Sequence, residues 1–387
     1  MPMRMEGSMR TCAEVRSAML GDVALVDATL CLTLPEIGVV VRSNTPALLA
    51  ELRHYFRHLV VTRNDDAGTV PMIEVIAIDR PPLEWALPWQ DWLREAGKQG
   101  KKDAVVDIAG GRLIRKVRTG MLFLQSLDYA IAAGPCLTNS NQVINFINNQ
   151  YMTLLQQRGW MICHAAALSQ GEKSIAIAGF SGGGKSTAML HLMADDRLNY
   201  ITNDRLFIRA ATDGVEVRGI PKLPRVNPGT LLHNPRLRPL LAPGRIAELQ
   251  ALPMAELWQL EQKYDVDIAS WYGGDRFSSQ PNLTHFIVLN WSHGRSPEAQ
   301  QPTTMERVDI DARPELLDAI MKSSGPFYQH ADGTFCTDHI QLPRQSYLAI
   351  LRQVQMFEVR GKVDFSYLQG AVVQRFVTTK HPTKKWL

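Results

Sequence analysis

The feature that most constrains this chain is a glycine-rich run, Gly179–Thr187, with the sequence GFSGGGKST. It matches the phosphate-binding pattern G-x-x-x-x-G-K-[ST], the Walker A motif, at every specified position. The apolar stretch Ser174–Ala178 precedes the run and predicts a buried strand, while Ser186–Ala194 has the apolar spacing of a helix. Because a strand, a glycine loop and a helix in this order form a P-loop unit, we expect an α/β domain around it.

The positions within the run have separate physical reasons. Glycine adopts positive φ without steric cost, so the loop backbone turns its N–H groups inward and forms an anion nest at the helix N-terminus. We expect Lys185 to bridge the β- and γ-phosphates of a nucleoside triphosphate and the Ser186 hydroxyl to ligate Mg²⁺. This predicts ATP and Mg²⁺ as the cofactors. The expected nucleotide-binding residues are Gly179, Ser181, Gly182, Gly183, Gly184, Lys185, Ser186 and Thr187.

A carboxylate suited to phosphoryl transfer lies in the segment after the expected loop helix. Asn199–Thr202 predicts the next strand, and it runs into the tripeptide Asn203–Arg205. Asp204 lies 19 residues after Lys185, so a helix and a short strand would return it to the side of the loop. Kinases need Mg²⁺ ligands and a carboxylate that orients or deprotonates the acceptor. We therefore expect Asp204 to share the metal with Ser186 and to receive the hydroxyl proton.

A further strand is predicted over Trp160–Leu168, and its residues His164–Ala167 add to a recognisable set. These residues, the P-loop and Asn203–Arg205 together resemble the kinase core of HPr kinase/phosphorylase, and more closely that of HPr-kinase-related kinase B. The resemblance covers roughly residues 140–300. It implies an HPr-kinase-like P-loop domain, with a fold similar to phosphoenolpyruvate carboxykinase, and an ATP-dependent serine kinase activity.

The resemblance also implies roles for single residues. In this superfamily a histidine precedes the P-loop strand, and His164 matches it, so we expect it to hydrogen-bond Asp204 or the γ-phosphate. An acidic pair usually follows the next strand, whereas this chain has Asn203 before Asp204. Asn203 cannot take a proton, so Asp204 must serve as base, metal ligand or both. The expected catalytic residues are Asp204, His164 and Lys185.

Two later segments are similar to signatures of the same family. Val215–Gly219 resembles its Leu-Glu-Ile-Arg-Gly signature, but Asp213–Gly214 predicts a hairpin turn. The turn places Glu216 on the order of 20 Å from Asp204 at ~3.3 Å per residue, so we do not expect Glu216 to share the metal. Pro243–Arg245 resembles the proline-glycine-arginine motif of HPr phosphorylases. The asparagine that usually follows is missing, so we do not expect dephosphorylation.

Two cations after the expected hairpin are candidate phosphate clamps. Lys222 and Arg225 lie in the proline-stiffened segment Pro221–Pro235, opposite the open end of the hairpin, on the side of Asp204. Fixed cations stabilise negative charge that develops in a transition state. We therefore expect both side chains to contact phosphate.

The length of 387 residues exceeds that of one ordinary core and predicts two domains. We place the boundary near Gly134-Pro135, just before a helix expected over Asn139–Gln157. This divides the chain into an N-terminal α/β accessory domain, residues 1–138, and a kinase domain, residues 139–387.

The accessory domain shows alternating strand and helix signals. Ile37–Val41 and Met72–Ile78 predict strands, Ala47–His58 predicts a helix, and Gly110-Gly111 predicts a hairpin turn. The side chains of Trp85, Trp89 and Trp92 have helical spacing, so we expect a short helix there with a packed aromatic face.

Composition excludes several classes of function. Lys plus Arg is 42 and Asp plus Glu is 38, and this formal charge of +4 suits anionic ligands but is too small for a nucleic-acid-binding protein. The five cysteines form no CxxC pair, which argues against disulfides and a zinc site. We find neither a signal-peptide pattern nor a run of about 18 apolar residues, so we expect a cytoplasmic protein without membrane contact.

These features favour a Mg²⁺-dependent kinase that transfers the γ-phosphoryl group of ATP to a hydroxyl, foremost a serine of a protein. A small-molecule acceptor is a close variant, and the sequence does not identify the phosphoacceptor. Asn203 in place of an acid favours an alternative, a nucleotide-gated binding or regulatory P-loop protein without transfer. A carboxykinase rests on shared fold alone. The resemblance also implies a homo-oligomer, of a size that the sequence leaves open.

Overall fold

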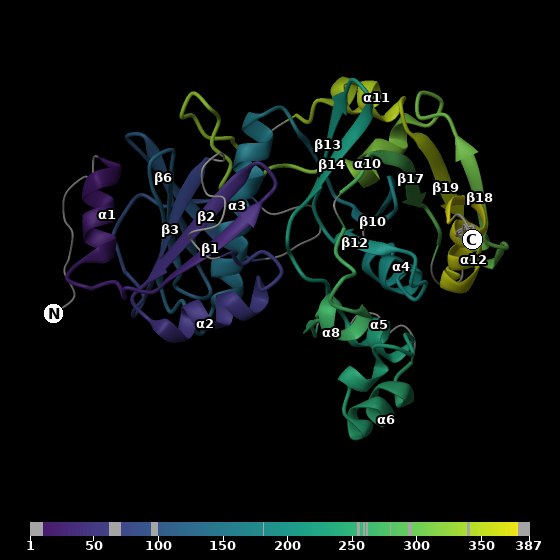
Figure 1. The fold of residues 1–387 in the computed structure, drawn as a ribbon, viewed down its shortest axis with the longest axis horizontal. Helices are drawn as coiled ribbons and strands as arrows, with labels where there is room; N and C mark the ends of the chain where they lie inside the picture. Colours follow the sequence, from purple (N-terminus) through teal and green to yellow (C-terminus); the bar gives the residue numbers. More distant parts are fainter. Residues whose placement is uncertain are drawn as a thin grey trace, which may run out of the picture. The chain divides into compact units, whose positions relative to one another are not determined.

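The computed structural model describes residues 11–61, 71–93, 100–180, 182–253, 256–257, 260, 262–278, 280–292, 296–338 and 341–377. The chain is a mixed α/β protein that divides into two compact units (Figure 1). The first unit consists of Met1–Gly159 and Ser323–Gln341, and the second consists of Trp160–Lys322 and Leu342–Leu387.

The first unit is built on an eight-stranded sheet with the strand order β1-β2-β3-β8-β7-β6-β5-β4. The pairs β2–β3 and β3–β8 are parallel, and the other neighbours are antiparallel. The strands are β1 (Thr29–Leu34), β2 (Ile37–Ser43), β3 (Met72–Asp79), β4 (Gln90–Asp91), β5 (Asp103–Ile108), β6 (Gly111–Lys116), β7 (Leu122–Ser126) and β8 (Ala130–Gly134). The helices are α1 (Cys12–Leu20), α2 (Pro46–Tyr55) and α3 (Ser140–Gln157).

Helices cover both faces of this sheet. Successive strand residues point to opposite faces, and every residue of β7 and β8 is buried. Met19 of α1 joins the core cluster with Leu122 and Leu124 of β7. Phe146 of α3 packs instead on Phe123, the strand residue between Leu122 and Leu124, with ring centroids 4.9 Å apart. α1 and α3 therefore lie on opposite faces, which explains why the central strands are apolar throughout.

Residues 323–341 return to this unit and are held there by a buried arginine. Nη1 of Arg112 on β6 donates to the carbonyl oxygens of Cys336, at 3.0 Å, and Pro326, at 3.3 Å. Its Nη2 donates to Asp107 Oδ2 at 2.9 Å. The Phe327 ring adds an edge contact to Phe123 at 5.5 Å.

The observed division differs from the expected boundary between residues 138 and 139. Because α3 buries its apolar face on β3 and β8, it belongs to the first unit, and the units divide at Gly159 and Trp160. A helix signal marks an element but does not show which sheet will cover it, so the boundary was placed before α3 instead of after it.

The local predictions for the first unit are confirmed with one exception. Strands β2 and β3, helix α2 and the β5–β6 hairpin lie where the sequence placed them. The tryptophan helix was wrong: residues 80–93 contain no helix, and Gln90–Asp91 forms β4. Prolines in this segment remove helix hydrogen bonds. The Trp89 ring instead stacks against Arg115 at 4.6 Å, while its Nε1 donates to the Trp85 carbonyl oxygen.

The second unit contains three sheets. A six-stranded sheet has the order β12-β10-β11-β17-β19-β18, a three-stranded sheet the order β14-β13-β9, and β15 pairs with β16. The strands are β9 (Met161–Cys163), β10 (Ala166–Gln170), β11 (Lys173–Gly179), β12 (Asn199–Thr202), β13 (Leu206–Ala211), β14 (Gly214–Gly219), β15 (Arg225–Val226), β16 (Tyr264–Asp265), β17 (Leu283–Leu289), β18 (Thr304–Val308) and β19 (Gln355–Arg360).

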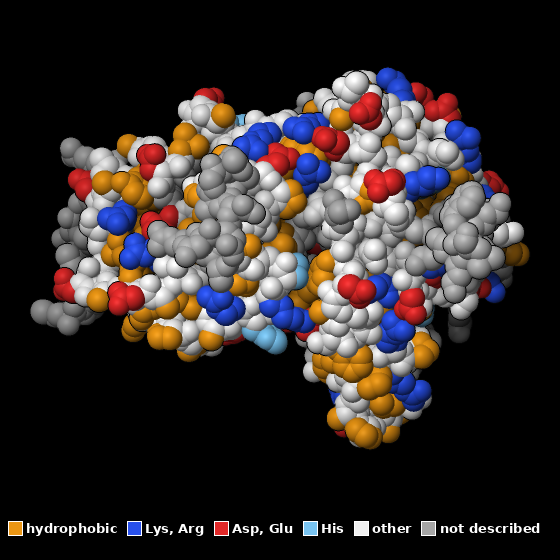
Figure 2. Space-filling view, viewed as in Figure 1, with side chains coloured by type: hydrophobic (Ala, Val, Ile, Leu, Met, Phe, Trp, Pro, Cys, Tyr) orange, Lys and Arg blue, Asp and Glu red, His pale blue; other side chains and the backbone are white. Residues whose placement is uncertain are grey.

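Its helices are α4 (Lys185–Leu192), α5 (Pro228–Leu232), α6 (Pro243–Ala251), α8 (Ile268–Tyr272), α9 (Pro297–Gln300), α10 (Leu317–Ile320), α11 (Arg344–Leu351) and α12 (Phe365–Phe376), with 3-10 turns at Arg238–Leu240 and Pro314–Leu316. Apolar side chains gather on the surface of the α5–α6 segment (Figure 2), where Pro239, Ala242 and Pro243 are exposed. This segment is inserted between β15 and β16, away from the main core.

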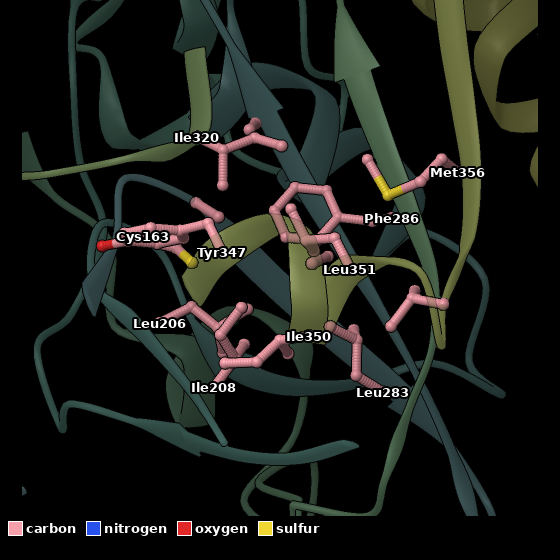
Figure 3. Close-up of a cluster of buried hydrophobic side chains, with 14 of the residues drawn as sticks. Cys163, Leu206, Ile208, Leu283, Phe286, Ile320, Tyr347, Ile350, Leu351 and Met356 are labelled. Atoms are coloured by element: carbon pink, nitrogen blue, oxygen red, sulfur yellow. The ribbon is translucent and has the colours of Figure 1, made fainter. Parts of the chain in front are cut away.

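The main core of the second unit lies between its two larger sheets. Figure 3 shows Phe286 of β17, Leu206 and Ile208 of β13, and Leu351 of α11 converging on one another. The buried Tyr347 of α11 donates its hydroxyl to the Ile162 carbonyl oxygen at 2.6 Å. This core fixes the three-stranded sheet against the six-stranded one, and so fixes the loops that join them.

One glycine allows β14 to cross the end of β12. A Cβ atom at Gly219 would lie 2.6 Å from the Ile201 carbonyl oxygen and 2.8 Å from Thr202 Cβ. Real Cβ atoms do not approach backbone this closely, so any larger residue must push the two strands apart. The crossing is directly followed by the segment that carries Lys222.

We predict that Gly219→Ala lowers the free energy of unfolding by about 2 kcal/mol, because overpacking of this size forces backbone to shift. The midpoint of urea denaturation would measure the change. Gly244→Ala is the control, because a Cβ there meets no atom within 4 Å and alanine favours the helix α6. A Gly219→Ala midpoint equal to that of the wild type would contradict the prediction.

Candidate active site around the P-loop

The glycine loop joins β11 to α4 with the geometry that its sequence predicts. Gly182 and Gly184 have φ of 77° and 76°, a region that favours glycine. The Gly183 N–H donates to the Phe180 carbonyl oxygen at 2.8 Å, and a Cβ on Gly183 would lie 2.9 Å from that oxygen. The strand, the loop and the helix are all present. Ser181, the remaining predicted loop residue, lies outside the described residues.

An aromatic group supports the loop from behind. Trp291, two residues after β17, donates its Nε1 to the Gly183 carbonyl oxygen at 2.9 Å. Its ring meets Phe365 of α12 edge to face at 5.0 Å, and a Cβ on Gly184 would lie 3.0 Å from the Phe365 ring. His191 of α4 stacks on Phe365 at 5.2 Å. These three side chains come from separate elements, so no local sequence pattern connects them with the loop.

A buried arginine holds the other end of α4. Arg276 donates from Nη2 to the carbonyl oxygens of Met193, at 3.2 Å, and Asp195, at 3.0 Å, and from Nε to Leu198 at 3.0 Å. The last carbonyls of a helix have no partner within the helix, and a cation there complements the helix dipole. Arg276 therefore fixes the C-cap of α4 and the turn that follows it, at the end of the helix opposite the loop.

The three polar side chains at the start of α4 have different surroundings. Lys185 Nζ lies 3.4 Å from the Gly179 carbonyl oxygen. Burial lowers the pKa of Lys185, the charge of Asp204 opposes this shift, and the charge of Arg205 adds to it. The Thr187 hydroxyl shares a hydrogen bond with Thr230 of α5 at 2.7 Å, whereas Ser186 is half-buried.

His164 lies where the chain passes from one sheet to the other. The strand expected over Trp160–Leu168 was wrong in one respect: it is interrupted at residues 164–165, which separate β9 from β10. The reason is that β9 pairs with β13, in the three-stranded sheet, whereas β10 pairs with β11 and β12. The backbone N–H of His164 donates a hydrogen bond to the Ile320 carbonyl oxygen at 2.7 Å.

The pairing register brings His164 to the turn that carries Asp204. Cys163 pairs with Leu206 on one side of the interruption, and Ala167 pairs with Thr202 on the other. The same antiparallel register therefore continues across the break and places residues 164 and 165 opposite residues 205 and 204. His164 Nε2 lies 3.4 Å from Asp204 Oδ1.

Asp204 also forms an ion pair with its neighbour Arg205, which the sequence did not predict. Nη1 of Arg205 lies 2.7 Å from Asp204 Oδ1. Thr202 fixes this turn, because its hydroxyl is 3.0 Å from the Arg205 carbonyl oxygen and 3.3 Å from that of Ile220. Arg205 is visible in the sequence, but the direction of its side chain toward Asp204 depends on the conformation of this turn.

The charges around Asp204 set its protonation. Burial alone would raise the pKa of Asp204, but Arg205, the hydrogen bond from His164 and the charge of Lys222 outweigh burial and hold the pKa far below its usual range. The pKa of His164 is raised by its hydrogen bond to Asp204, yet burial and the charges of Lys185 and Arg205 leave it below the ordinary value. At neutral pH the pair is a carboxylate beside a neutral imidazole.

The two predicted phosphate clamps separate in the structure. The Lys222 carbonyl oxygen accepts a hydrogen bond from Tyr200 at 2.6 Å, and the Lys222 ammonium acts on Asp204. Arg225 instead pairs with Asp265 at 2.8 Å across the β15–β16 ladder. The structure therefore groups Lys222, but not Arg225, with the charges of the site.

Glu216 pairs with Arg209 at 2.8 Å, directly across the β13–β14 hairpin. Its carboxylate therefore forms an ion pair within the hairpin, at the position along β14 that the predicted turn gives it. Arg245 of the proline-glycine-arginine motif lies in α6 and pairs with Glu248 at 2.7 Å.

Asn203, in the position of the missing acid, is 7% exposed. Its Oδ1 has no hydrogen-bond partner among the residues that the structure describes. A buried acceptor without a partner costs about 1–3 kcal/mol, and few are retained. Next to Asp204, this oxygen fits a metal ion or a ligand donor.

A magnesium ion here would depend on the nucleotide for most of its ligands. The described parts of the chain hold no group of three or more His, Cys, Asp and Glu side chains that could bind a metal. Mg²⁺ uses one or two carboxylates together with phosphates and water in nucleotide sites. Asp204 and Ser186, with Asn203 nearby, fit that ligand set.

The five cysteines are buried and free. None of the helices in the described ranges is both long and apolar enough to cross a membrane. Comparison with protein-family models gives no match, and neither does comparison with curated proteins. Function is therefore inferred from the geometry of the site.

We predict that His191 makes the protein less stable in mild acid. Burial, with a smaller effect of His233, lowers the pKa of His191, and its Nε2 has no hydrogen-bond partner within the described chain. In the pH range just below ~6.5 the unfolded state therefore binds more protons, so stability rises with pH through this range and is lost as pH falls.

The urea midpoint at pH 5.5 and 7.5 measures this slope. His191→Phe retains an aromatic ring on Phe365 and should flatten the slope. His54→Gln, on the exposed face of α2, controls for the loss of one histidine. An unchanged slope in His191→Phe would contradict the prediction.

Proposed function

We propose that the protein is a Mg²⁺-dependent, ATP-binding kinase that transfers the γ-phosphoryl group to a hydroxyl, foremost a protein serine. The observation that carries this proposal is the pair of His164 and Asp204, 3.4 Å apart, whose ionised carboxylate acts electrostatically on Lys185, the lysine of the P-loop. Phosphoryl transfer depends on positioning and on charge stabilisation, and these groups supply both.

In this proposal, the glycine loop and the first residues of α4 bind the phosphates. The inward N–H groups, the helix N-terminus and Lys185 would hold the β- and γ-phosphates, with Gly183 and Gly184 allowing close approach. The hydrogen bond from Trp291 and the Phe365 ring keep this backbone in place before a nucleotide arrives. Such preorganisation avoids reordering the loop during the reaction.

A bound Mg²⁺ would neutralise charge on the phosphates, and Ser186 and Asp204 are the residues to hold it. Asp204 would also accept a hydrogen bond from the acceptor hydroxyl and direct a lone pair of its oxygen at the phosphorus. His164 would hold the carboxylate in this orientation.

The acceptor oxygen forms a bond to the γ-phosphorus as the bond from phosphorus to the β,γ-bridging oxygen breaks. The hydroxyl proton passes to Asp204. A carboxylate with a low pKa is sufficient, because the transition state is loose and the acceptor oxygen becomes acidic once it is bonded to phosphorus. The leaving group departs as the nucleoside diphosphate.

Asn203 supports the second candidate, a nucleotide-gated binding protein without transfer. Where two acids would provide separate metal and base functions, this chain offers one carboxylate and an amide. Both candidates require nucleotide binding, so they differ only in turnover.

We predict that Asp204→Asn reduces transfer at least about 100-fold, because it removes the proton acceptor while nearly preserving shape. The assay adds γ-labelled ATP and Mg²⁺ to lysate of the source cell and follows label in protein bands and small molecules. Lys185→Ala should lose nucleotide binding as well. Glu216→Gln is the matched control, because Glu216 pairs with Arg209 on the hairpin.

Each outcome has a distinct meaning. A labelled product that requires Asp204 would establish the kinase and reveal its acceptor. Nucleotide binding without transfer by the wild type would favour the binding protein, and decarboxylation of oxaloacetate would favour carboxykinase chemistry. Transfer that survives Asp204→Asn would show that Asp204 is not the base.

A further inference from the structure

Three cations surround a single carboxylate in the candidate site. Arg205 contacts Asp204, and the charges of Lys185 and Lys222 act on the same carboxyl group. With His164 neutral, these groups sum to +3 − 1 = +2. Buried charge of one sign is costly unless a partner compensates it. A polyphosphate, even when partly neutralised by Mg²⁺, is the anion that fits this excess.

Arg205 is built into the site by its backbone. Its carbonyl oxygen accepts from the Thr202 hydroxyl at 3.0 Å, and the register of the β13–β14 hairpin sets Ile220 opposite it. The side chain is 22% exposed, so it is neither a solvated surface arginine nor a fully enclosed one.

The guanidinium of Arg205 uses few of its donors. Its hydrogen bonds within the described chain, to Asp204 Oδ1 and to the Asp204 carbonyl oxygen, both come from Nη1. The N–H groups on Nε and Nη2 therefore remain for another acceptor. A planar fork with two donors is the group that matches two oxygens of a phosphoryl group.

The same guanidinium acts on the phosphate-binding lysine. Its charge lowers the pKa of Lys185 and that of His164, so it lies within electrostatic reach of both. Arg225 contrasts with it, because Asp265 neutralises Arg225 at 2.8 Å and its side chain is 40% exposed. Of these two arginines, it is thus Arg205 whose charge acts on Lys185, the lysine of the P-loop.

We propose that Arg205 is a catalytic residue, whose free Nε–Nη2 edge contacts the transferred phosphoryl group while Nη1 retains Asp204. This inference rests on the proposed function and adds a residue to it. In the transition state, negative charge is spread over the equatorial oxygens of the phosphoryl group, and an arginine supplied by the same chain stabilises that charge. Ground-state nucleotide binding gains less from it, because Lys185 and the loop already hold the other phosphates.

The experiment compares two probes that need no acceptor: MgADP, and MgADP with aluminium fluoride as a mimic of the phosphoryl group in transfer. Affinities are measured calorimetrically for the wild type, Arg205→Ala, Arg205→Lys and the matched control Arg225→Ala. We expect MgADP affinity to change less than about threefold in all variants. The gain in affinity on adding aluminium fluoride should fall about 100-fold or more in Arg205→Ala and remain in Arg225→Ala.

Arg205→Lys retains the charge without the fork, so its gain should lie between those of the wild type and Arg205→Ala. It also keeps the test valid if Arg205→Ala unfolds. A wild type that gains affinity with aluminium fluoride, and an Arg205→Ala or Arg205→Lys variant that gains equally, would overturn this inference and leave the proposed function standing. A wild type that binds no MgADP would overturn the proposed function together with the inference.

Discussion

The carboxylate of Asp204 is the charge on which the candidate site depends. It is partly buried, yet Arg205, His164 and Lys222 together keep it ionised against the cost of that burial. Removing any of these partners would raise the pKa of Asp204, because each lowers the pKa of the same carboxyl group. The turn at Asn203 supplies the carboxylate, and the strand interruption at His164 supplies its neighbour. One antiparallel register aligns them.

The glycine loop depends on a separate set of contacts. Loop glycines provide freedom rather than rigidity, so the surroundings must select one conformation. Trp291 and Phe365, from behind the loop, provide that selection, and Arg276 fixes α4 from its far end. The glycine loop follows β11 and the carboxylate turn follows β12, two strands of the same six-stranded sheet, and the core around Phe286 packs against this sheet (Figure 3).

Sequence reasoning succeeded where the signal was local. The P-loop unit, the strand Asn199–Thr202 and the β13–β14 hairpin were found from glycine positions and apolar spacing. It failed where a competing interaction decided the outcome. Prolines and arginine stacking prevented a helix at Trp85–Trp92, and pairing with two different sheets interrupted Trp160–Leu168. The unit boundary was misplaced because α3 could be assigned only after its partner strands were known.

The sequence by itself determined the conformation of the glycine loop, since positive φ at glycine and the strand–helix succession around it depend on neighbouring residues only. It also determined that Asp204 would follow a strand. Tertiary structure alone decided which cations join that carboxylate. The same charge is carried by Lys222, Arg225 and Arg205. The hairpin register brings Lys222 and Arg205 to Asp204, whereas Arg225 forms an ion pair with Asp265 instead. Electrostatic energy depends on distances between side chains, and those distances exist only after distant strands have paired.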